Sequence, residues 1–361
     1  MWWSGSQPED SEPCHRIRTS YGCSGSPRPI RILHRQRSYD CCGRPCGSEQ
    51  LLVGIGQPRS HEPGCGSSLS YYDPIWDELF GLSSPRPKKS LGQHWLTDQS
   101  TSDKIAALAA KEAGQSIFEI GPGAGALTRP LLNRYERVVA LETDRQALAY
   151  LKEEFATEIA DGRLELFEGD GRSFALPEAP DGAWTVVSNL PYNVGAIVFL
   201  NLLAQRSKIR RMVLMFQAEV ATRILSGSGS KQHGFLSVLS ALEWSRTRAL
   251  RVKPGAFFPP PKVQSSVIVL DRDDDGPGCP APREIFVPFV DACFRQRRKT
   301  LRNCLTHAGY SAEAIAQMFQ AEGLAQTIRA EQLDAGRFRS LFLALPLTIH
   351  QQCMGLSAPS E

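Results

Sequence analysis

A short polar segment at residues 188–193 carries residue types suited to holding a flat nitrogenous base. It follows an apolar run, Trp184–Val187, that predicts a buried strand. At the carboxyl end of that strand Asn189 offers a side-chain amide, the next two residues offer backbone carbonyls, and Tyr192 offers an aromatic face. Amide and carbonyl oxygens accept the hydrogens of an exocyclic amine, so the segment predicts a base-accepting pocket.

A second candidate site lies upstream, where glycines follow another apolar run. Gly121, Gly123 and Gly125 form a turn between a predicted strand and a predicted helix, where backbone can approach a ligand closely. Glu142 ends the next strand, where a carboxylate can hold two ribose hydroxyls, and Asp170 follows the third, where it can accept from an adenine amine. An ordinary turn with solvent-facing carboxylates is the alternative. Three such strand ends in succession favour a nucleotide-like cofactor.

The fourth strand decides which cofactor the residues favour. A nicotinamide enzyme needs a hydride acceptor site and usually a proton donor such as His or Tyr. This strand ends instead in Asn-Leu-Pro-Tyr, residues 189–192, which favours S-adenosylmethionine.

A largely parallel sheet would bring these groups to one edge. Apolar runs predict strands at residues 116–120, 138–142, 164–168, 184–188, 212–216 and 263–270. Helical spacing predicts helices at residues 101–113, 127–134 and 145–155. Helices between strands indicate βαβ units and an α/β fold, with the last strand pairing as a hairpin with residues 249–252.

Composition and spacing divide the chain. Hydrophobic residues make up 42% of it and no apolar run reaches the roughly 18 residues of a membrane span, so we expect a globular protein without a membrane partner. Residues 86–272 would hold the sheet, and Asp- and Gly-rich residues 271–278 read as a linker. Residues 282–345 predict a small all-α domain and residues 346–361 a tail, which we expect to be loose over residues 351–361.

Residues 1–85 differ from the rest in being rich in Gly, Pro, Ser, Arg and Cys, with neither helical nor strand periodicity. We expect this segment to be disordered, or a spurious extension with the true start further on. Its acidic residues argue against a transit peptide, and no signal-peptide pattern is seen. No metal site is predicted, because Cys-x-x-Cys spacing is absent among the candidate ligands Cys41, Cys42, Cys46, His61 and Cys65.

Charge is distributed unevenly. The net charge is only +3, which does not by itself predict a nucleic-acid partner. Five cations nevertheless crowd one segment: Arg295, Arg297, Arg298, Lys299 and Arg302. Such a cluster can neutralise phosphates and release counterions, whereas a solvated helix face is the alternative.

Taken in order, these motifs resemble those of the ribosomal RNA adenine dimethyltransferases. The similar segments are Lys88–Leu96, Glu119–Gly125, Glu142, Asp170, Asn189–Asn193, Phe257–Ser265 (the family's Phe-x-Pro-x-Pro-Lys-Val-x-Ser pattern) and Phe294–Asn303, its basic helix. The resemblance covers residues 86–345 and is greatest for the bacterial branch that acts on small-subunit RNA.

The resemblance implies a Rossmann-like class I methyltransferase sheet, a small C-terminal all-α domain and S-adenosylmethionine as the cofactor. By position it implies cofactor contacts at His94, Leu96, Gly121, Glu142, Asp170 and Asn189. His94 stands where the family usually has Asn, and Ala218 where Lys is common. The implied substrate is two adjacent adenines in a hairpin loop near the 3′ end of 16S rRNA, in the small subunit or its precursor. The implied enzyme is a cytoplasmic monomer.

Residues 188–193 and the family resemblance together predict a mechanism. The catalytic candidates are Asn189, Leu190, Pro191, Tyr192 and Phe257. The Asn189 side-chain oxygen and the Leu190 or Pro191 carbonyl would accept the two N–H bonds of the adenine amine and free its lone pair. Tyr192 and Phe257 would stack on the extruded base.

Three other functions compete with this one. An antibiotic-resistance type enzyme would modify 23S rRNA, but the long Phe-Phe-Pro-Pro-Pro-Lys motif and the helical domain fit the small-subunit branch better. A DNA adenine methyltransferase would need a target-recognition domain, and none is visible in the sequence. A mainly non-catalytic ribosome assembly or RNA-binding factor is the third alternative, and residues 189–192 and Glu142 favour catalysis over it.

Overall fold

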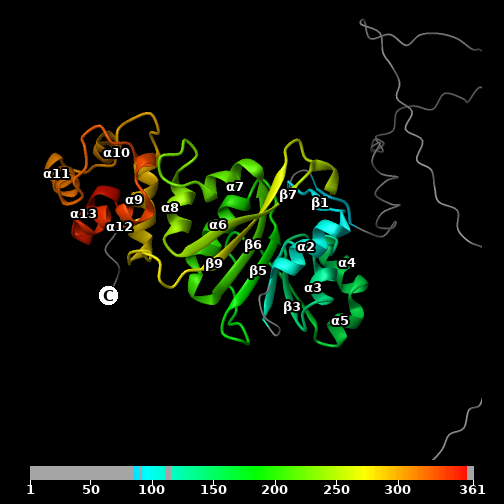
Figure 1. Ribbon diagram of the computed structural model, residues 1–361. Coiled ribbons are helices and arrows are strands. Elements are labelled where there is room, and N and C mark those ends of the chain that lie inside the picture. Colours follow the sequence, from blue (N-terminus) through cyan, green and yellow to red (C-terminus); the bar gives the residue numbers. More distant parts are fainter. Residues whose placement is uncertain (1–84, 89–91, 110–114, 356–361) are drawn as a thin grey trace, which may run out of the picture. The chain divides into compact units, whose positions relative to one another are not determined.

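The structure is a computed structural model that describes residues 85–88, 92–109 and 115–355. The predictions for residues 1–84, with the candidate zinc ligands, lie outside the described residues. Within them a seven-stranded sheet has the order β4-β3-β2-β5-β6-β9-β7 (Figure 1). The strands from β4 to β6 are parallel, while β9 runs antiparallel to both β6 and β7. Helices between the strands complete the α/β fold that the sequence predicts.

The strand bounds lie close to the predicted ones. The seven strands are β2 (Ile117–Ile120), β3 (Val138–Glu142), β4 (Leu164–Glu168), β5 (Trp184–Asn189), β6 (Ile209–Gln217), β7 (Trp244–Val252) and β9 (Ser265–Arg272). A second sheet pairs β1 (Trp95–Leu96) with β8 (Phe257–Phe258). The predicted hairpin partner of the last strand is β7, which begins earlier than expected.

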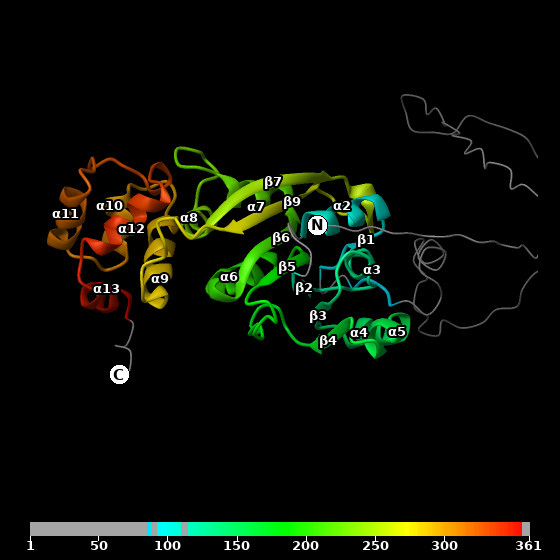
Figure 2. The ribbon, with the colours of Figure 1, turned by 60° about the horizontal axis from the view of Figure 1, so that its bottom comes forward.

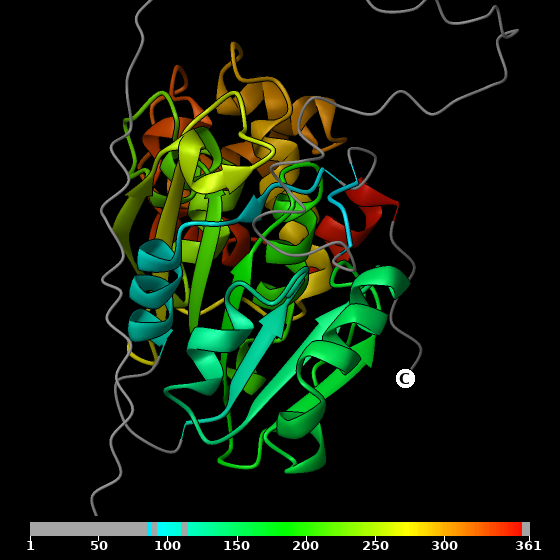
Figure 3. The same ribbon diagram turned by 90° about the vertical axis from the view of Figure 1, so that its right-hand side faces the viewer.

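Helices cover both faces of the large sheet. They are α2 (Gln99–Ala109), α3 (Thr128–Leu132), α4 (Arg145–Glu154), α5 (Ala156–Ala160), α6 (Gly195–Ala204), α7 (Ala218–Leu225) and α8 (Phe235–Ala241). Side chains alternate between faces along a strand, so Ile117 of β2 belongs to a hydrophobic cluster with residues of α2 and α3, and Phe118 to a second cluster that includes residues of α6 and α8. Figure 3 shows the early helices, in cyan and green, alongside the strands. Burial on both faces explains the continuous apolar runs in the sequence.

The strand order places the candidate residues at one point of the sheet. Strand β2 lies between β3 and β5, so the chain leaves β2 toward one side of the sheet and continues from β5 toward the other. The connections at the carboxyl ends of β2 and β5 therefore diverge. Divergence of this kind opens the crevice where α/β sheets bind ligands.

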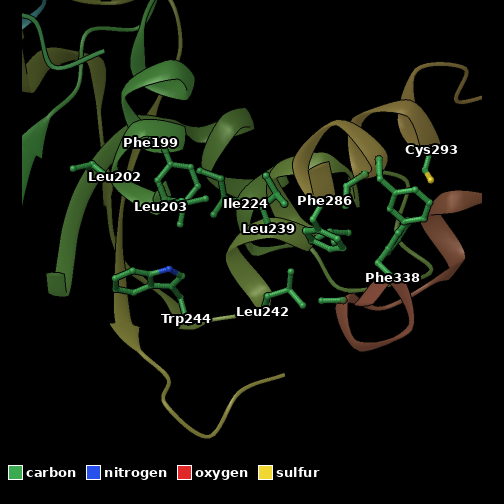
Figure 4. Packing of buried hydrophobic residues seen from close by; sticks show 14 of the residues in the cluster. Phe199, Leu202, Leu203, Ile224, Leu239, Leu242, Trp244, Phe286, Cys293 and Phe338 are labelled. Carbon is green, nitrogen blue, oxygen red and sulfur yellow. The ribbon is translucent and has the colours of Figure 1, made fainter. Parts of the chain in front are cut away.

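The remaining helices form a group beyond α8 (Figure 2). They are α9 (Arg283–Phe294), α10 (Leu301–His307), α11 (Ala312–Ala321), α12 (Ala335–Leu343) and α13 (Leu347–Met354). Helix α8 contacts α9 and α12. Figure 4 shows Leu239 of α8 beside Phe286 of α9, and both belong to one continuous hydrophobic cluster. This shared core fixes the helices against the sheet region.

The expectation of a loose tail is wrong for residues 351–354, because they belong to α13, which spans residues 347–354. The reason is a buried polar anchor that has no periodic signal. His350 is fully buried, its Nδ1 accepts from the Tyr310 hydroxyl at 2.6 Å, and its Nε2 donates to the Phe342 carbonyl at 2.9 Å. Across the described residues no helix is both long and apolar enough to span a bilayer.

Candidate functional site

A cavity of about 260 Å³ opens at the carboxyl ends of β2, β3 and β5. Nine of the predicted site residues line it: His94, Leu96, Gly121, Glu142, Asp170, Asn189, Leu190, Pro191 and Tyr192. They come from segments nearly a hundred residues apart. The parallel sheet joins them because carboxyl ends of parallel strands meet at one edge.

The glycine turn forms one wall of the cavity. Gly121 has φ +71°, a left-handed conformation, and no atom lies within 4 Å of the place where a Cβ would stand. Gly123 has φ +58°, and a Cβ there would meet the Trp95 indole at 3.1 Å. The turn therefore leaves an open cradle of backbone, which fits close approach by a ligand.

Glu142 ends β3 with its carboxylate held by backbone. One oxygen accepts from the Gly123 N–H at 3.0 Å, and the other accepts from the Thr143 and Asp144 N–H groups, both at 2.8 Å. Burial raises the pKa of Glu142, and these hydrogen bonds oppose that rise. The carboxylate is thus tied to the glycine turn, and three of its roughly four lone-pair positions are in use, which leaves about one, on the oxygen that faces Gly123, for a ligand hydroxyl.

Glu119 is a cavity-lining carboxyl that the sequence analysis did not single out. It lies within β2, is 1% exposed, and accepts from the Thr128 hydroxyl at 2.8 Å. Burial raises its pKa to about 8, with a smaller contribution from the negative charge of Glu142. An acidic residue inside the apolar run Ile-Phe-Glu-Ile was the available signal, because strand burial makes a charge there costly.

Asp170 lies after β4 at the rim of the cavity. Its carboxylate receives the Arg172 guanidinium, with Nε to Oδ2 at 2.8 Å, and the Arg172 backbone N–H at 2.9 Å. These bonds hold the pKa of Asp170 below its usual value. The group stays an ionised acceptor at neutral pH, and Arg172 already donates to both of its oxygens, so an adenine amine would share this carboxylate with that side chain.

The Asn189 amide has a defined orientation. Its Nδ2 donates to the His94 backbone carbonyl at 3.0 Å. A carbonyl only accepts, so the NH₂ must face His94, and Oδ1 remains the acceptor of the amide. The Pro191 carbonyl accepts from the Val194 and Gly195 N–H groups at the start of α6. This engagement favours Leu190 over Pro191 as the second acceptor.

Tyr192 is clamped between two segments. Its hydroxyl is hydrogen-bonded to the Ser265 hydroxyl at the start of β9. Its ring stacks with the His94 imidazole at a centroid distance of 5.1 Å and an interplanar angle of 30°. The His94 Nδ1 donates to the Pro259 carbonyl at 2.7 Å, which ties Tyr192 to the proline loop. One face of the Tyr192 ring is therefore already occupied.

The expectation that Phe257 stacks on the extruded base does not fit the position of this side chain. Phe257 is 3% exposed and is not among the described residues that line the cavity. Its strand β8 pairs with β1, with Phe257 opposite Leu96, and its side chain belongs to the buried hydrophobic cluster that includes Val252 and Ile105. It belongs to the core of this face, which a motif alone does not reveal.

The cations at residues 295–302 do not form one basic helix, which corrects the expectation for residues 294–303. Helix α9 ends at Phe294, and α10 begins at Leu301 because the Thr300 side chain caps it through the Asn303 N–H. Arg295, Arg297, Arg298 and Lys299 lie in the turn between them, and Arg302 lies in α10.

These cations also differ in their partners. Arg295 pairs with Asp291 at 2.8 Å, and Arg302 donates to Gln326. Arg297 donates to the Lys231 and His233 carbonyls, so it braces the loop before α8. Arg298 and Lys299 are exposed, and no ion pair joins them to a carboxylate within the described residues. They are the cations of this turn that are best placed to meet a phosphate.

The described residues hold no group of three or more metal-ligating side chains. Cys279, Cys293, Cys304 and Cys353 are free thiols. Burial raises the pKa of each of these thiols, which keeps them protonated near neutral pH.

Comparison with known proteins agrees with this geometry. The model of the family described as ribosomal RNA adenine dimethylase matches residues 85–346. Ribosomal RNA small subunit methyltransferase A of Geobacter sulfurreducens is 39% identical over 267 residues, covering 71% of this chain and 94% of that protein.

Two solved structures share the fold. A dimethyladenosine transferase from Plasmodium falciparum has a TM-score of 0.58 at 23% identity, covering 73% of this chain and 99% of its own. The 23S rRNA methyltransferase ErmE has a TM-score of 0.52 at 22% identity, covering 70% of this chain and 99% of its own. With the family match over residues 85–346, the resemblance seen in the sequence is confirmed, and the chain belongs to the ribosomal RNA adenine dimethylase family.

Proposed function

We propose that this chain transfers methyl groups from S-adenosylmethionine to the N6 amines of two adjacent adenines in a hairpin loop near the 3′ end of 16S rRNA. The observation that carries the proposal is the Asn189 amide, which donates to the His94 carbonyl and so keeps Oδ1 as an acceptor beside the cavity. Relatives named for the small-subunit RNA favour this substrate over 23S rRNA.

The residues of the cavity fit the proposed cofactor. The open cradle at Gly121 suits backbone approach, the remaining acceptor position of Glu142 suits a ribose hydroxyl, and Asp170 suits an adenine amine. His94 and Leu96 complete the proposed contacts from the other wall. When bound, the cofactor supplies an electrophilic methyl group on a sulfonium.

The chain's own residues prepare the accepting amine. Asn189 Oδ1 and the Leu190 carbonyl accept its two N–H bonds, which favours a pyramidal nitrogen with a directed lone pair. Tyr192, held by His94 and Ser265, stacks on the extruded ring, a contact worth about 1–3 kcal/mol. Positioning and preorganised acceptors supply the remaining rate enhancement, and the amine proton passes to water afterwards.

The RNA contacts proposed for the helical region begin at the turn between α9 and α10. Arg298 and Lys299 bind phosphates directly, and Arg295, Arg297 and Arg302 contribute charge while holding the turn and its neighbours. The protein acts as a monomer on the small subunit or its precursor, in the cytoplasm. Size-exclusion chromatography of the protein alone tests whether it is a monomer.

The deciding experiment is incubation of the purified protein with labelled S-adenosylmethionine and immature small subunits, followed by mapping of the modified bases. Two adjacent N6-dimethylated adenines near the 3′ end are expected. Because small subunits contain no 23S rRNA, a parallel reaction is run with 23S rRNA, and label found only there would support the antibiotic-resistance alternative. Subunit binding without label transfer would support the assembly-factor alternative and overturn catalysis.

A further inference from the structure

Strand β7 carries a row of cations along the edge of the sheet. In an antiparallel pair, residues directly opposite each other share a face. Arg246 is opposite Leu270, Arg248 opposite Ile268, and Arg251 opposite Ser266. Those three β9 positions are two apart, so the three arginines point to the same face.

A register shift between Arg248 and Leu250 makes this alignment. In a regular strand, Arg251 would point to the face opposite Arg248, because side chains alternate. The extra residue of the bulge returns Arg251 to the face of Arg248. The charged face is therefore a consequence of the backbone irregularity as well as of the sequence.

One end of the row reaches the catalytic segment. Val252, the residue after Arg251, is opposite Ser265, and the Ser265 hydroxyl binds the Tyr192 hydroxyl. Arg251 and Lys253 flank Val252 and are exposed. These two cations thus lie one strand away from Ser265, at the same end of the sheet as Tyr192, although alternation points Arg251 to the other face from the Ser265 side chain.

The other end leads toward the helical region. Arg246 is anchored to the Ile224 and Ser237 carbonyls, and Arg248 donates to the Thr222 hydroxyl of α7 at 2.8 Å. The next residue on α7, Arg223, lines a second cavity of about 240 Å³. Arg295 and Arg297 line the same cavity, so cations continue from β7 to the turn after α9.

Acidic side chains neutralise only part of this row. Glu219 pairs with Arg223, and Asp291 pairs with Arg295. Within residues 85–88, 92–109 and 115–355, no ion pair joins Arg251 or Lys253 to a carboxylate. Charges on an edge strand also discourage pairing with another sheet. Charges that only prevented such pairing would not need a bulge that aligns the arginines on one face, nor further arginines on α7.

We propose that Lys253, Arg251, Arg248 and Arg223 form an RNA-backbone track that guides the strand leading from the methylated loop to the turn between α9 and α10. Guanidinium groups match phosphate geometry, and an open row of them suits a polyanion rather than a compact acidic ligand. This inference rests on the proposed function, since it extends the same RNA beyond the pocket.

The test compares two full-length double variants that remove the same charge. R251Q/K253Q neutralises the track beside the catalytic segment. K104Q/K152Q neutralises two exposed lysines on α2 and α4, helices that pack on the opposite face of the sheet. Binding of a labelled RNA hairpin with two adjacent loop adenines is titrated between about 50 and 200 mM salt, with S-adenosylmethionine affinity measured in parallel.

The track variant should bind the hairpin about tenfold more weakly, with a salt slope reduced by about 0.7–0.9 for each lost phosphate contact. Its KM for RNA should rise, while kcat at saturating RNA and cofactor affinity stay unchanged. The control should match wild type. Equal losses in both variants, or a loss of cofactor affinity in the track variant, would overturn the track.

The two proposals fail separately. If the wild type methylates RNA and R251Q/K253Q binds the hairpin with an unchanged salt slope, the proposed track is contradicted and the proposed function stands. If hairpin binding depends on the track residues but the wild type transfers no methyl group, the track stands and the proposed function is contradicted. A wild-type protein that neither binds the hairpin nor methylates immature small subunits would contradict both proposals.

Discussion

Asn189 and His94 are joined by a hydrogen bond from the Asn189 side-chain amide to the His94 backbone carbonyl, across 95 residues of sequence. This bond fixes which end of the amide donates. The catalytic acceptor is consequently oriented by a different segment, the one that also stacks on Tyr192.

Replacing Asn189 tests that relationship. Asn189→Ala should abolish methyl transfer while leaving S-adenosylmethionine affinity within about tenfold, since loss of one positioned polar group commonly costs about 10²–10³ in rate. Asn189→Asp should also fail, because a carboxylate cannot donate to the His94 carbonyl. Single-turnover transfer and cofactor titration measure the two effects. Normal turnover by either variant would refute the mechanism.

Arg297 and Arg298 should respond differently to neutralisation. Arg298→Gln should weaken RNA binding and flatten its salt dependence, because this side chain is exposed and available to phosphate. Arg297→Gln should lower the free energy of unfolding by about 1–3 kcal/mol, since the Lys231 and His233 carbonyls lose their donor. Urea unfolding and salt titrations of both variants separate these roles. Identical behaviour in both assays would contradict the assignment.

Glu119 should make stability fall as pH rises. Its pKa is about 8 in the fold against an ordinary value of 4.5, so the folded chain holds a proton that the unfolded chain releases. Its stability contribution is full below pH 4.5 and is lost as pH rises toward about 8. Glu119→Gln should therefore raise the free energy of unfolding at alkaline pH by about 1–3 kcal/mol. Chemical unfolding of both proteins at acidic and alkaline pH measures this; no gain at alkaline pH would disprove it.

His350 should act in the opposite sense. Burial lowers its pKa below the ordinary value of 6.5, since the charged ring is disfavoured in the core. Stability is full above pH 6.5 and is lost as pH falls from there through the folded pKa, because the unfolded chain takes up the proton first. Acid unfolding followed by circular dichroism should thus show release of α13 before the sheet. His350→Gln should remove that dependence, and Tyr310→Phe, which keeps the histidine, should retain it.

Local pattern was enough to predict the strands and the cofactor edge. Val138–Glu142 and Leu164–Glu168 coincide with β3 and β4. Strand β3 is buried along its length and leaves an apolar run, whereas β4 lies at the sheet edge and alternates apolar and acidic residues. Gly121, Glu142, Asp170 and Asn189 share one cavity because the strand order puts their carboxyl ends together. Each of these predictions needed only short-range periodicity and one topological rule.

Tertiary contacts decided the rest. Phe257 entered the core through its pairing with Leu96, Arg297 turned to loop carbonyls, and His350 tied down α13 through Tyr310. The donor direction of Asn189 came from His94 in the same way. Those outcomes depend on partners distant in sequence, whose hydrogen bonds and packing leave no periodic trace in the chain itself. The sequence by itself determined which groups reach the sheet edge, and the tertiary structure decided which of them remain available to a ligand.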